Sequence, residues 1–533
     1  MSLMRIFVSH SHTDDEFADQ LVVELRNAGA DVWYDKENLG QAHIRDTVER
    51  EMRKRDVFIV VLSPTALESK WVKAEINAAL DLQDDNKSRV ILPIVAETVN
   101  QGDITAFLRN IPRVEGRNAS ALPHEESIRK TLSRLGLELE QASLYPESVS
   151  QAIVHCYRLR GCITGGLGKP LLVSPDLAAP QNSKRGTQGY TMPFENGAIF
   201  WTEASGAHPI WWGIRDCFIR KDGLKGRLGF PVTDEIVIPE NPITKTRGVC
   251  QRFEFEWDYA PDIIEQANGV RHGATVYWCA PDHGHPVWGG IGEGYERNGG
   301  ASKYLGFPTS DEMAAAPSPT GTTGWYQTFQ RGTIYWCSRC ETRGGNPVHG
   351  AIGALFHQLG GTGSRLGFPL TGEMTAAISQ QGSSGVFQRF EGKWDYPPDI
   401  RRLPDIPYGA SIYWCKAYGA QPVWAGIGEF YERQFGTGSL LGFPTAREVA
   451  TTSPFGTEGA YQTFEGGLVA WHPKYYSIMV SGSILTLYLA SGGCSGKYGF
   501  PIAAEMVPTA GWRSQEFEGG LIGAPSDDSS SRS

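Results

Sequence analysis

The chain has 533 residues and a formal net charge of −10, with a sequence pI near 5.7. This length exceeds what one hydrophobic core serves, so we expect several domains. The acidic balance, without a block of Lys and Arg interleaved with aromatic residues, argues against nucleic acid as a partner. No apolar run reaches the roughly 20 residues of a membrane span, and the first residues, MSLMRIFVSHSHTDD, lack the apolar core of a signal peptide. We therefore expect a soluble, cytoplasmic protein without a membrane span.

Up to about residue 138, short apolar runs alternate with longer stretches of helical pattern. The runs are MRIFVSH, ADVWYD, DVFIVVLS and RVILPIV, and the stretches between them are DDEFADQLVVELRNAG, HIRDTVEREMRKR and SKWVKAEINAALDL. Near-continuous apolar strands that alternate with helices predict a parallel sheet covered on both faces. The fold class expected for this part is a doubly wound, flavodoxin-like α/β domain.

In such a sheet, ligands bind beyond the carboxyl ends of the strands. The residues to inspect at these ends are Ser9, His10, Ser11 and His12 after the first strand, Asp35 and Lys36 after the second, and Ser63 and Pro64 after the third. Further along, SKWVKAEINAAL places Trp71 and Glu75 four residues apart on one face of a helix. This pair fits either a pocket or an ordinary amphipathic helix, and we expect the glutamate to be largely exposed. Neither of the common glycine-rich phosphate-binding motifs occurs, so no phosphate clamp is assigned.

From about residue 139 the composition changes, and repetition replaces the alternating pattern. Thirteen of the fifteen tryptophans lie beyond residue 200. The segments GRLGFPVTDE, KYLGFPTSDE, SRLGFPLTGE, LLGFPTARE and KYGFPIAAE recur, with an eroded first copy in GGLGKPLLV. A period of roughly 60 to 75 residues indicates a repeat architecture in which each unit is a hairpin plus a short helix. We assign residues 139–150 to a linker, 151–525 to a repeat domain of about six units and 526–533 to a disordered tail.

The recurring residues have structural explanations first. The glycine of each LGFP element suits a positive φ, and the Phe-Pro that follows packs an aromatic ring and stops a helix. The acid after each element is expected to pair with an arginine of its own unit, with a ligand role as the less favoured reading. Exposed Trp and Tyr of the units could recognise a glycan or a peptide. The recurring acids are Glu235, Glu312, Glu373, Glu448 and Glu505.

The nine cysteines do not suggest a disulfide framework or a metal site. The one CxxC, Cys337 to Cys340, has no second pair at zinc spacing. Cys337 recurs as Cys279 and Cys415, so we interpret it as a repeat position.

The N-terminal segments IFVSHSHTDDEFADQLVVELRNAGADVWYD, VFIVVLSPTALESKWVKAEINAAL and VILPIV together resemble a bacterial TIR domain, over residues 1–138. Some TIR domains are scaffolds, and others cleave the nicotinamide glycosidic bond of NAD. The resemblance implies that SKWVKAE holds the essential glutamate, Glu75, with Trp71 as its aromatic neighbour. It also implies that His10 and Ser11 line the nucleotide pocket, although a strand-end histidine satisfied by its neighbours is nearly as good a reading of His10. Asp35 and its following loop match the segment that gates the pocket and packs TIR domains together.

The later part resembles LGFP-repeat proteins, known from the cell envelope of mycolate-containing bacteria. This resemblance implies tandem units that close into a propeller-like ring. Because the chain shows no export signal, a cell-wall role departs from the usual context of these repeats.

Together these observations predict an NAD+ glycohydrolase that releases nicotinamide and forms ADP-ribose or cyclic ADP-ribose. NAD+ is the substrate, and no cofactor or metal is expected. The repeats would act as a sensor for an unknown glycan or protein, TIR domains would self-associate, and bacterial anti-phage defence would be the setting. The alternatives are a non-catalytic TIR scaffold and an envelope glycan-binding or effector protein.

Overall fold

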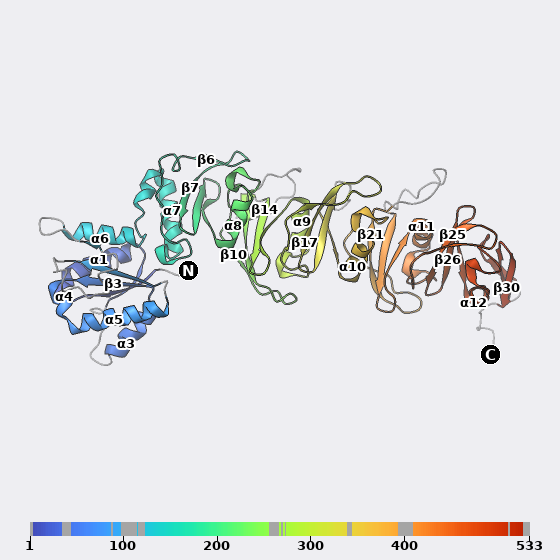
Figure 1. The fold of residues 1–533 in the computed structure, drawn as a ribbon, viewed down its shortest axis with the longest axis horizontal. Helices are drawn as coiled ribbons and strands as arrows, with labels where there is room; N and C mark the ends of the chain where they lie inside the picture. The colour runs from blue at the N-terminus through green and yellow to red at the C-terminus, as the bar shows by residue number, and fades with distance from the viewer. Residues whose placement is uncertain are drawn as a thin grey trace. The chain divides into compact units, whose positions relative to one another are not determined.

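The protein is described from a computed structural model, which covers residues 4–34, 44–86, 89–96, 114–115, 123–254, 266–267, 270–271, 273–337, 344–392, 409–509 and 512–525. The chain divides into two compact units, Met1–Val237 with Val249–Val276, and Ile238–Gly248 with Tyr277–Ser533. Figure 1 shows their helices and strands. None of the described helices is both long and apolar enough to cross a membrane.

The first unit begins with a five-stranded parallel sheet in the order β2-β1-β3-β4-β5. Its strands are β1 (Arg5–Ser9), β2 (Asp31–Tyr34), β3 (Val57–Leu62), β4 (Val90–Val95) and β5 (Val114–Glu115). The surrounding helices are η1 (His12–Asp14), α1 (Asp15–Asn27), α3 (Ile44–Arg53), α4 (Pro64–Glu68), α5 (Lys70–Asp85) and α6 (Pro123–Arg134). The doubly wound α/β fold expected from the sequence is confirmed, and the short β5 is an addition to the four predicted strands.

Strand β3 shows why the sheet needs helices on both faces. All six of its residues, VFIVVL, are buried. Phe58 packs with Phe7 and with residues of α3 and α5 on one face, whereas Ile59 belongs to the cluster that α1 and α6 cover on the other. A strand that is apolar on both faces is stable only between two helical layers.

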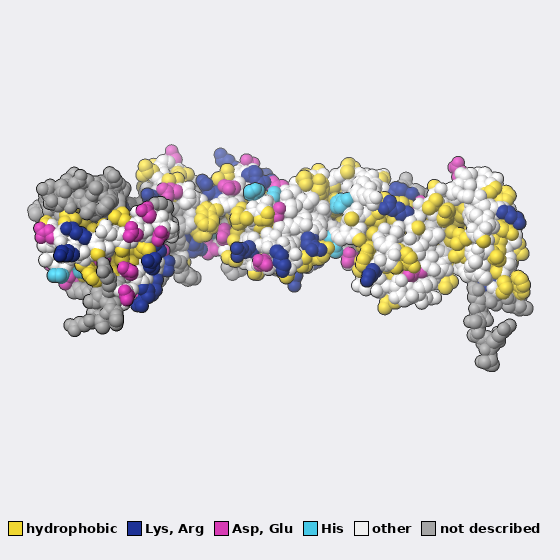
Figure 2. All heavy atoms as spheres, turned by 60° about the horizontal axis from the view of Figure 1, so that its bottom comes forward, with side chains coloured by type: hydrophobic (Ala, Val, Ile, Leu, Met, Phe, Trp, Pro, Cys, Tyr) yellow, Lys and Arg dark blue, Asp and Glu magenta, His cyan; other side chains and the backbone are white. Residues whose placement is uncertain are grey.

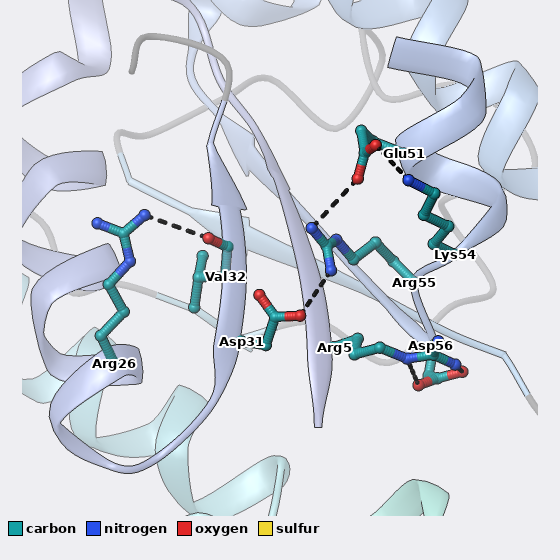
Figure 3. Close-up of polar contacts among 8 residues, drawn as sticks. All are labelled: Arg5, Arg26, Asp31, Val32, Glu51, Lys54, Arg55 and Asp56. Carbon is teal, nitrogen blue, oxygen red and sulfur yellow. Dashed lines mark hydrogen bonds and ion pairs between the residues drawn. The ribbon is translucent and has the colours of Figure 1, made fainter. Parts of the chain in front are cut away.

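Charged side chains gather where the parallel strands begin (Figure 3). The Arg5 guanidinium donates two hydrogen bonds of 3.0 Å to the carboxylate of Asp56. Arg55, only 8% exposed, donates to Asp31 at 2.8 Å and to Glu51 at 3.4 Å. These pairs tie the starts of β1, β2 and β3 together at the edge opposite the carboxyl ends of the strands.

The segment that follows the parallel sheet is helical and packed. It contains η3 (Glu140–Leu144), α7 (Glu147–Leu159) and η4 (Cys162–Thr164), so the residues assigned to a linker form η3 and the first turn of α7. The Tyr145 hydroxyl donates to the carbonyl oxygen of Thr191 at 2.8 Å, and burial raises the pKa of Tyr145 to about 12. Arg158 of α7 donates to the carbonyl oxygen of Leu137. One cluster of buried apolar side chains runs from β1 through this segment to Ile199 of the next sheet.

The rest of the chain consists of small antiparallel sheets, each associated with a short helix. The first two sheets are formed by β6 (Gln181–Asn182), β7 (Gln188–Phe194), β8 (Gly197–Thr202) and β9 (Gly206–Trp211), and by β10 (Ile236–Ile238), β11 (Gly248–Phe253), β14 (Ala274–Cys279) and β15 (His283–Trp288). The next two are formed by β16 (Met313–Ala314), β17 (Gly324–Phe329), β18 (Gly332–Cys337) and β19 (Asn346–His349), and by β20 (Met374–Thr375), β21 (Gly385–Phe390), β22 (Ala410–Cys415) and β23 (Gly419–Trp424). The last two are formed by β24 (Val449–Thr452), β25 (Glu458–Phe464), β26 (Gly467–His472) and β27 (Tyr476–Ser481), and by β28 (Met506–Thr509), β29 (Trp512–Phe517) and β30 (Gly520–Pro525). A two-stranded sheet joins β12 (Gln266–Ala267) to β13 (Val270–Arg271). The helices are α8 (Trp212–Arg220), η5 (Gly223–Lys225), α9 (Gly289–Arg297), η6 (Gly300–Ser302), α10 (Gly350–Gln358), η7 (Gly361–Gly363), α11 (Ala425–Arg433), η8 (Gly436–Gly438), α12 (Gly482–Ala490) and η9 (Gly493–Ser495).

The predicted hairpin and short helix are present, and further strands extend most hairpins to four-stranded sheets. Each sheet is separate, and the described residues show no closed barrel or propeller. The ring expected from the family resemblance therefore stays a prediction.

The LGFP element is a joint between the helix and the hairpin of a unit. In the fourth full copy, Gly442 has φ +65°, and its carbonyl oxygen accepts a hydrogen bond of 2.6 Å from Tyr431 in α11. Pro444 forms an isolated bridge with Phe464 at the end of β25, and the Tyr431 ring stacks on Phe464. The tyrosine contact recurs at Tyr157, Tyr295 and Tyr488.

A carboxylate that the sequence analysis did not single out completes this joint. The Glu465 carboxylate, at the turn of the β25–β26 hairpin, accepts from the backbone N–H of Phe443 at 2.9 Å and also from the hydroxyl of Ser383 in the preceding unit. Glu518 makes the corresponding contacts with Phe500 and Thr457. These glutamates therefore link neighbouring units.

The glutamates that follow the LGFP elements have varied partners. Glu505 pairs with Arg513 of its own unit, as the sequence analysis expects. Glu448 instead lies 3.5 Å from Arg365 of the preceding unit, and Glu373 lies 3.9 Å from His349. Glu235 accepts a hydrogen bond of 3.0 Å from the Trp211 indole, and burial raises the pKa of this carboxyl group.

A buried histidine replaces the recurring cysteine at the end of β26. His472 is fully buried against Tyr475 and Phe500, and burial lowers the pKa of its imidazole. Because the unfolded imidazole titrates near pH 6.5, its contribution to stability is complete above that pH. The contribution is lost as the pH falls toward the lower folded pKa.

We predict that His472→Cys flattens the acid dependence of stability. Each pH unit below about 6.5 should remove up to about 1.4 kcal/mol from the wild type through this group, until the folded pKa is reached. Thermal unfolding midpoints between pH 8 and pH 5 measure the difference. The exposed His155, changed to Gln, is the control, and an unchanged pH dependence in His472→Cys would contradict the prediction.

We also predict that ending the chain before Ser483 causes aggregation. The truncation removes Ile484 and Tyr488 of α12, which cover Leu468, Ala470 and Val480, and it leaves a bare apolar face. Light scattering of the purified chains measures the effect, with a chain ending at Pro525 as the control. A monodisperse, folded product would show that each unit is stable without its neighbour.

Candidate active site

The carboxyl end of β1 and the start of α5 form the candidate site. Two serine side chains cap the starts of α4 and α5. The Ser63 hydroxyl oxygen accepts from the N–H of Ala66 at the start of α4, and the Ser69 hydroxyl oxygen accepts from the N–H of Val72 at the start of α5. Ser63 also donates to the buried carboxylate of Asp14 at 2.7 Å, so the loop after β1 is held against the same turn. N-capping of this kind fixes where the first helical residues lie.

Glu75 lies in the second turn of α5 and is buried, with 5% of its surface exposed. The expectation of a largely exposed glutamate is therefore wrong. Its carboxylate accepts a hydrogen bond from the hydroxyl of Ser9, the last residue of β1. A buried carboxylate is stable only with such hydrogen bonds, because it has left water.

A cavity of about 310 Å³ has Glu75 among its lining residues. Trp71 lines it together with Glu75, and the Trp71 side chain remains 37% exposed. Residues of α3 form the facing wall, with Val48 and Met52 as its apolar part. The predicted shared face of Trp71 and Glu75 thus borders a real cavity, whose other lining residues are Glu49, Lys70, Ala74 and Ala78.

His10 and Ser11 lie next to this pair of elements but have partners of their own. His10 is buried, and its Nε2 lies 3.0 Å from Asp15 and 3.2 Å from the Tyr34 hydroxyl. Its ring packs on Tyr34 with 4.8 Å between centroids. The Ser11 hydroxyl oxygen accepts from Thr13 at 3.2 Å. Both residues keep their predicted roles as proposals.

Asp35, Cys340 and the tail predicted at residues 526–533 lie outside the described residues. Cys337 is buried at the end of β18, in register with Gly324. Within the described part of the chain, no three His, Cys, Asp or Glu side chains come together as a metal ion would require.

Sequence reasoning placed Ser9 among the residues at the end of the first strand without giving it a role, and it missed the wall from α3. Ser9 lies two residues after Phe7 in β1, so both side chains lie on the same face of the sheet, the one covered by α3 and α5. The alternation was readable in the sequence, but the identity of the helix that covers this face was not.

Comparisons with known proteins agree with a chain that has an N-terminal α/β domain followed by a repeat region. The family model for the TIR domain matches residues 6–132, and the model for the LGFP repeat matches residues 177–226, 305–364 and 441–496. The probable 2′ cyclic ADP-D-ribose synthase TcpO of Methanobrevibacter olleyae is 31% identical over 136 residues, which are 25% of this chain and 39% of that protein. The NAD(+) hydrolase TcpC of Escherichia coli O6:H1 is 37% identical over 92 residues, which are 16% of this chain and 29% of that protein.

The matches to the two relatives cover 25% and 16% of this chain. The chain spans 39% and 29% of the length of these two relatives. Among solved structures, the TIR domain of the Toll-related receptor TRR-2 from Hydra magnipapillata is 16% identical with a TM-score of 0.21, over 25% of this chain and 97% of that one. The family models therefore identify a TIR domain at residues 6–132 and LGFP repeats at residues 177–226, 305–364 and 441–496.

Proposed function

We propose that the TIR domain cleaves NAD+ between nicotinamide and ribose, with Glu75 as the catalytic carboxylate. The observation that carries this proposal is a buried glutamate beside a cavity that an exposed tryptophan also lines. The names of the relatives support the substrate, since one is an NAD(+) hydrolase and the other a probable cyclic ADP-ribose synthase.

The chemistry needs little besides one carboxylate. Nicotinamide carries positive charge while bound to ribose and leaves as a neutral molecule, so no general acid is required. The ribose left behind develops oxocarbenium character, which a nearby carboxylate stabilises. Attack by water yields ADP-ribose, and attack by a group of the same molecule yields a cyclic product. NAD+ is the substrate, and the reaction calls for no further cofactor.

The cavity walls suit these roles. Val48, Met52 and Trp71 provide apolar and aromatic surface for the planar nicotinamide ring. Glu75 on the same cavity faces the site where positive charge develops. We assign His10, Ser11 and Asp35 to contacts with the remainder of the nucleotide.

We predict that Glu75→Gln lowers the rate of nicotinamide release at least about a hundredfold. The amide keeps the size of the side chain and still accepts the Ser9 hydroxyl, so the variant should stay folded. Nicotinamide release is measured at equal folded concentration, with the exposed Glu68, changed to Gln, as the control for the same substitution elsewhere. Equal rates in wild type and Glu75→Gln would overturn the assignment.

The two rival functions make different predictions. A non-catalytic scaffold predicts no nicotinamide release by the wild type, even when the chains are clustered. An envelope-binding protein predicts that purified cell wall retains the repeat domain.

We further propose that the repeats control the TIR domain, through self-association or ligand capture, in anti-phage defence or a related response. The core that continues from β1 through α7 to Ile199 joins the TIR domain to the first repeat sheet without a break. Hydrophobic side chains are also spread over the face of the repeat units that Figure 2 shows. Trp212, Trp325 and Trp512 are 66%, 45% and 60% exposed, and we assign such aromatics to an unknown glycan or protein ligand.

We predict that clustering the full chain on a surface, through a C-terminal tag, raises the rate per molecule several-fold. Tethering raises the local concentration of TIR domains and favours their association. Nicotinamide release at equal total protein compares clustered and free chains, with clustered Glu75→Gln as the zero control. A rate that does not change on clustering would contradict control through local concentration.

A further inference from the structure

Ser9 occupies an unusual place for a polar side chain. It is the last residue of β1 and is only 2% exposed. Two residues earlier on the same face, Phe7 packs against Trp33 and Phe58 in an apolar cluster that includes Ala79 of α5. A hydroxyl on this face is unfavourable unless it makes a hydrogen bond. Packing by itself does not require a hydroxyl at this position, and an alanine would be sufficient for it.

The hydroxyl of Ser9 has a partner of special interest. It donates to Oε2 of Glu75 across a sequence separation of 66 residues. The contact joins the carboxyl end of β1 to the second turn of α5, and both side chains are buried. It is therefore a charge-assisted hydrogen bond shielded from water, which is the stronger kind.

We infer that Ser9 is a positioning residue for the catalytic carboxylate, an inference that rests on the proposed function of Glu75. The hydrogen bond holds one carboxylate oxygen in a single orientation beside the cavity. It also favours the charged form of the carboxylate, which is the form that stabilises an oxocarbenium-like ribose. Ser9 does not itself contact the reacting atoms in this scheme.

A positioning role has a kinetic signature. A carboxylate that is free to rotate, or that protonates more readily, stabilises the transition state less while substrate binding changes little. Ser9→Ala should therefore lower kcat about tenfold to a hundredfold, with KM within about threefold of the wild type. The pH below which activity falls should also move upward in Ser9→Ala.

The experiment compares wild type, Ser9→Ala, Ser9→Thr and Glu75→Gln in the full chain. Steady-state nicotinamide release is measured with NAD+ from pH 5 to pH 8. Ser9→Thr keeps the hydroxyl on a strand residue and should restore most of kcat. Ser127→Ala, which also removes a buried serine hydroxyl but in α6, is the control for packing loss. Circular dichroism and thermal unfolding establish that each variant is folded.

The outcomes separate the two proposals. Equal rates in wild type and Glu75→Gln would defeat the proposed function itself. If Glu75→Gln is inactive, a wild-type kcat in Ser9→Ala would overturn the role of Ser9 alone. A loss confined to KM, or a pH profile of folded Ser9→Ala that matches the wild type, would overturn it as well. A lowered kcat with a shifted pH profile supports it, even if Ser9→Thr fails to fold.

Discussion

The burial of β3 on both faces is the constraint on which the N-terminal site depends. Because every residue of this strand is buried, helices must cover both sides of the sheet. The segment that leaves β3 forms α4 and α5, and α5 packs in the same layer as α3. In this arrangement the first turns of α5 reach the carboxyl end of β1, next to β3 in the sheet. The site is a consequence of strand order.

The two edges of the parallel sheet have opposite characters. At the edge where strands begin, Arg5, Arg55, Asp31 and Asp56 pair with one another and satisfy their charges (Figure 3). At the other edge, Glu75 is buried beside a cavity. Burying a carboxylate lowers stability unless it is compensated, and such unfavourable placements are concentrated at functional sites. The contrast between the edges is the physical reason to look for chemistry at one and stability at the other.

The repeats depend on contacts between nearest neighbours. The amide of the fully buried Gln327 donates to carbonyl oxygens of Pro286 in β15 and of Ser310. Gln388, Gln462 and Gln515 likewise each donate to two carbonyl oxygens, one of them on the last strand of the preceding sheet. These contacts stabilise the repeats because a buried carbonyl oxygen without a hydrogen bond is unfavourable. For the first repeat sheet, β6 to β9, the buried cluster that includes residues of α7 provides the packing surface, and this cluster joins the repeats to the TIR domain.

Local pattern in the sequence determined the four long strands of the TIR domain, its helices α1, α3 and α5, the shared face of Trp71 and Glu75, and the repeated units. These features follow from periodicities of two and 3.6 residues and from recurring motifs, which involve residues close in the chain. Only the tertiary structure decided that Glu75 is buried, that Ser9 donates to it, and that α3 supplies the facing wall of the cavity. The same holds for the turn carboxylate of Glu465, whose partner Ser383 lies 82 residues away. Such contacts depend on which helix covers which face and on how one unit meets the next, and no local pattern contains that information.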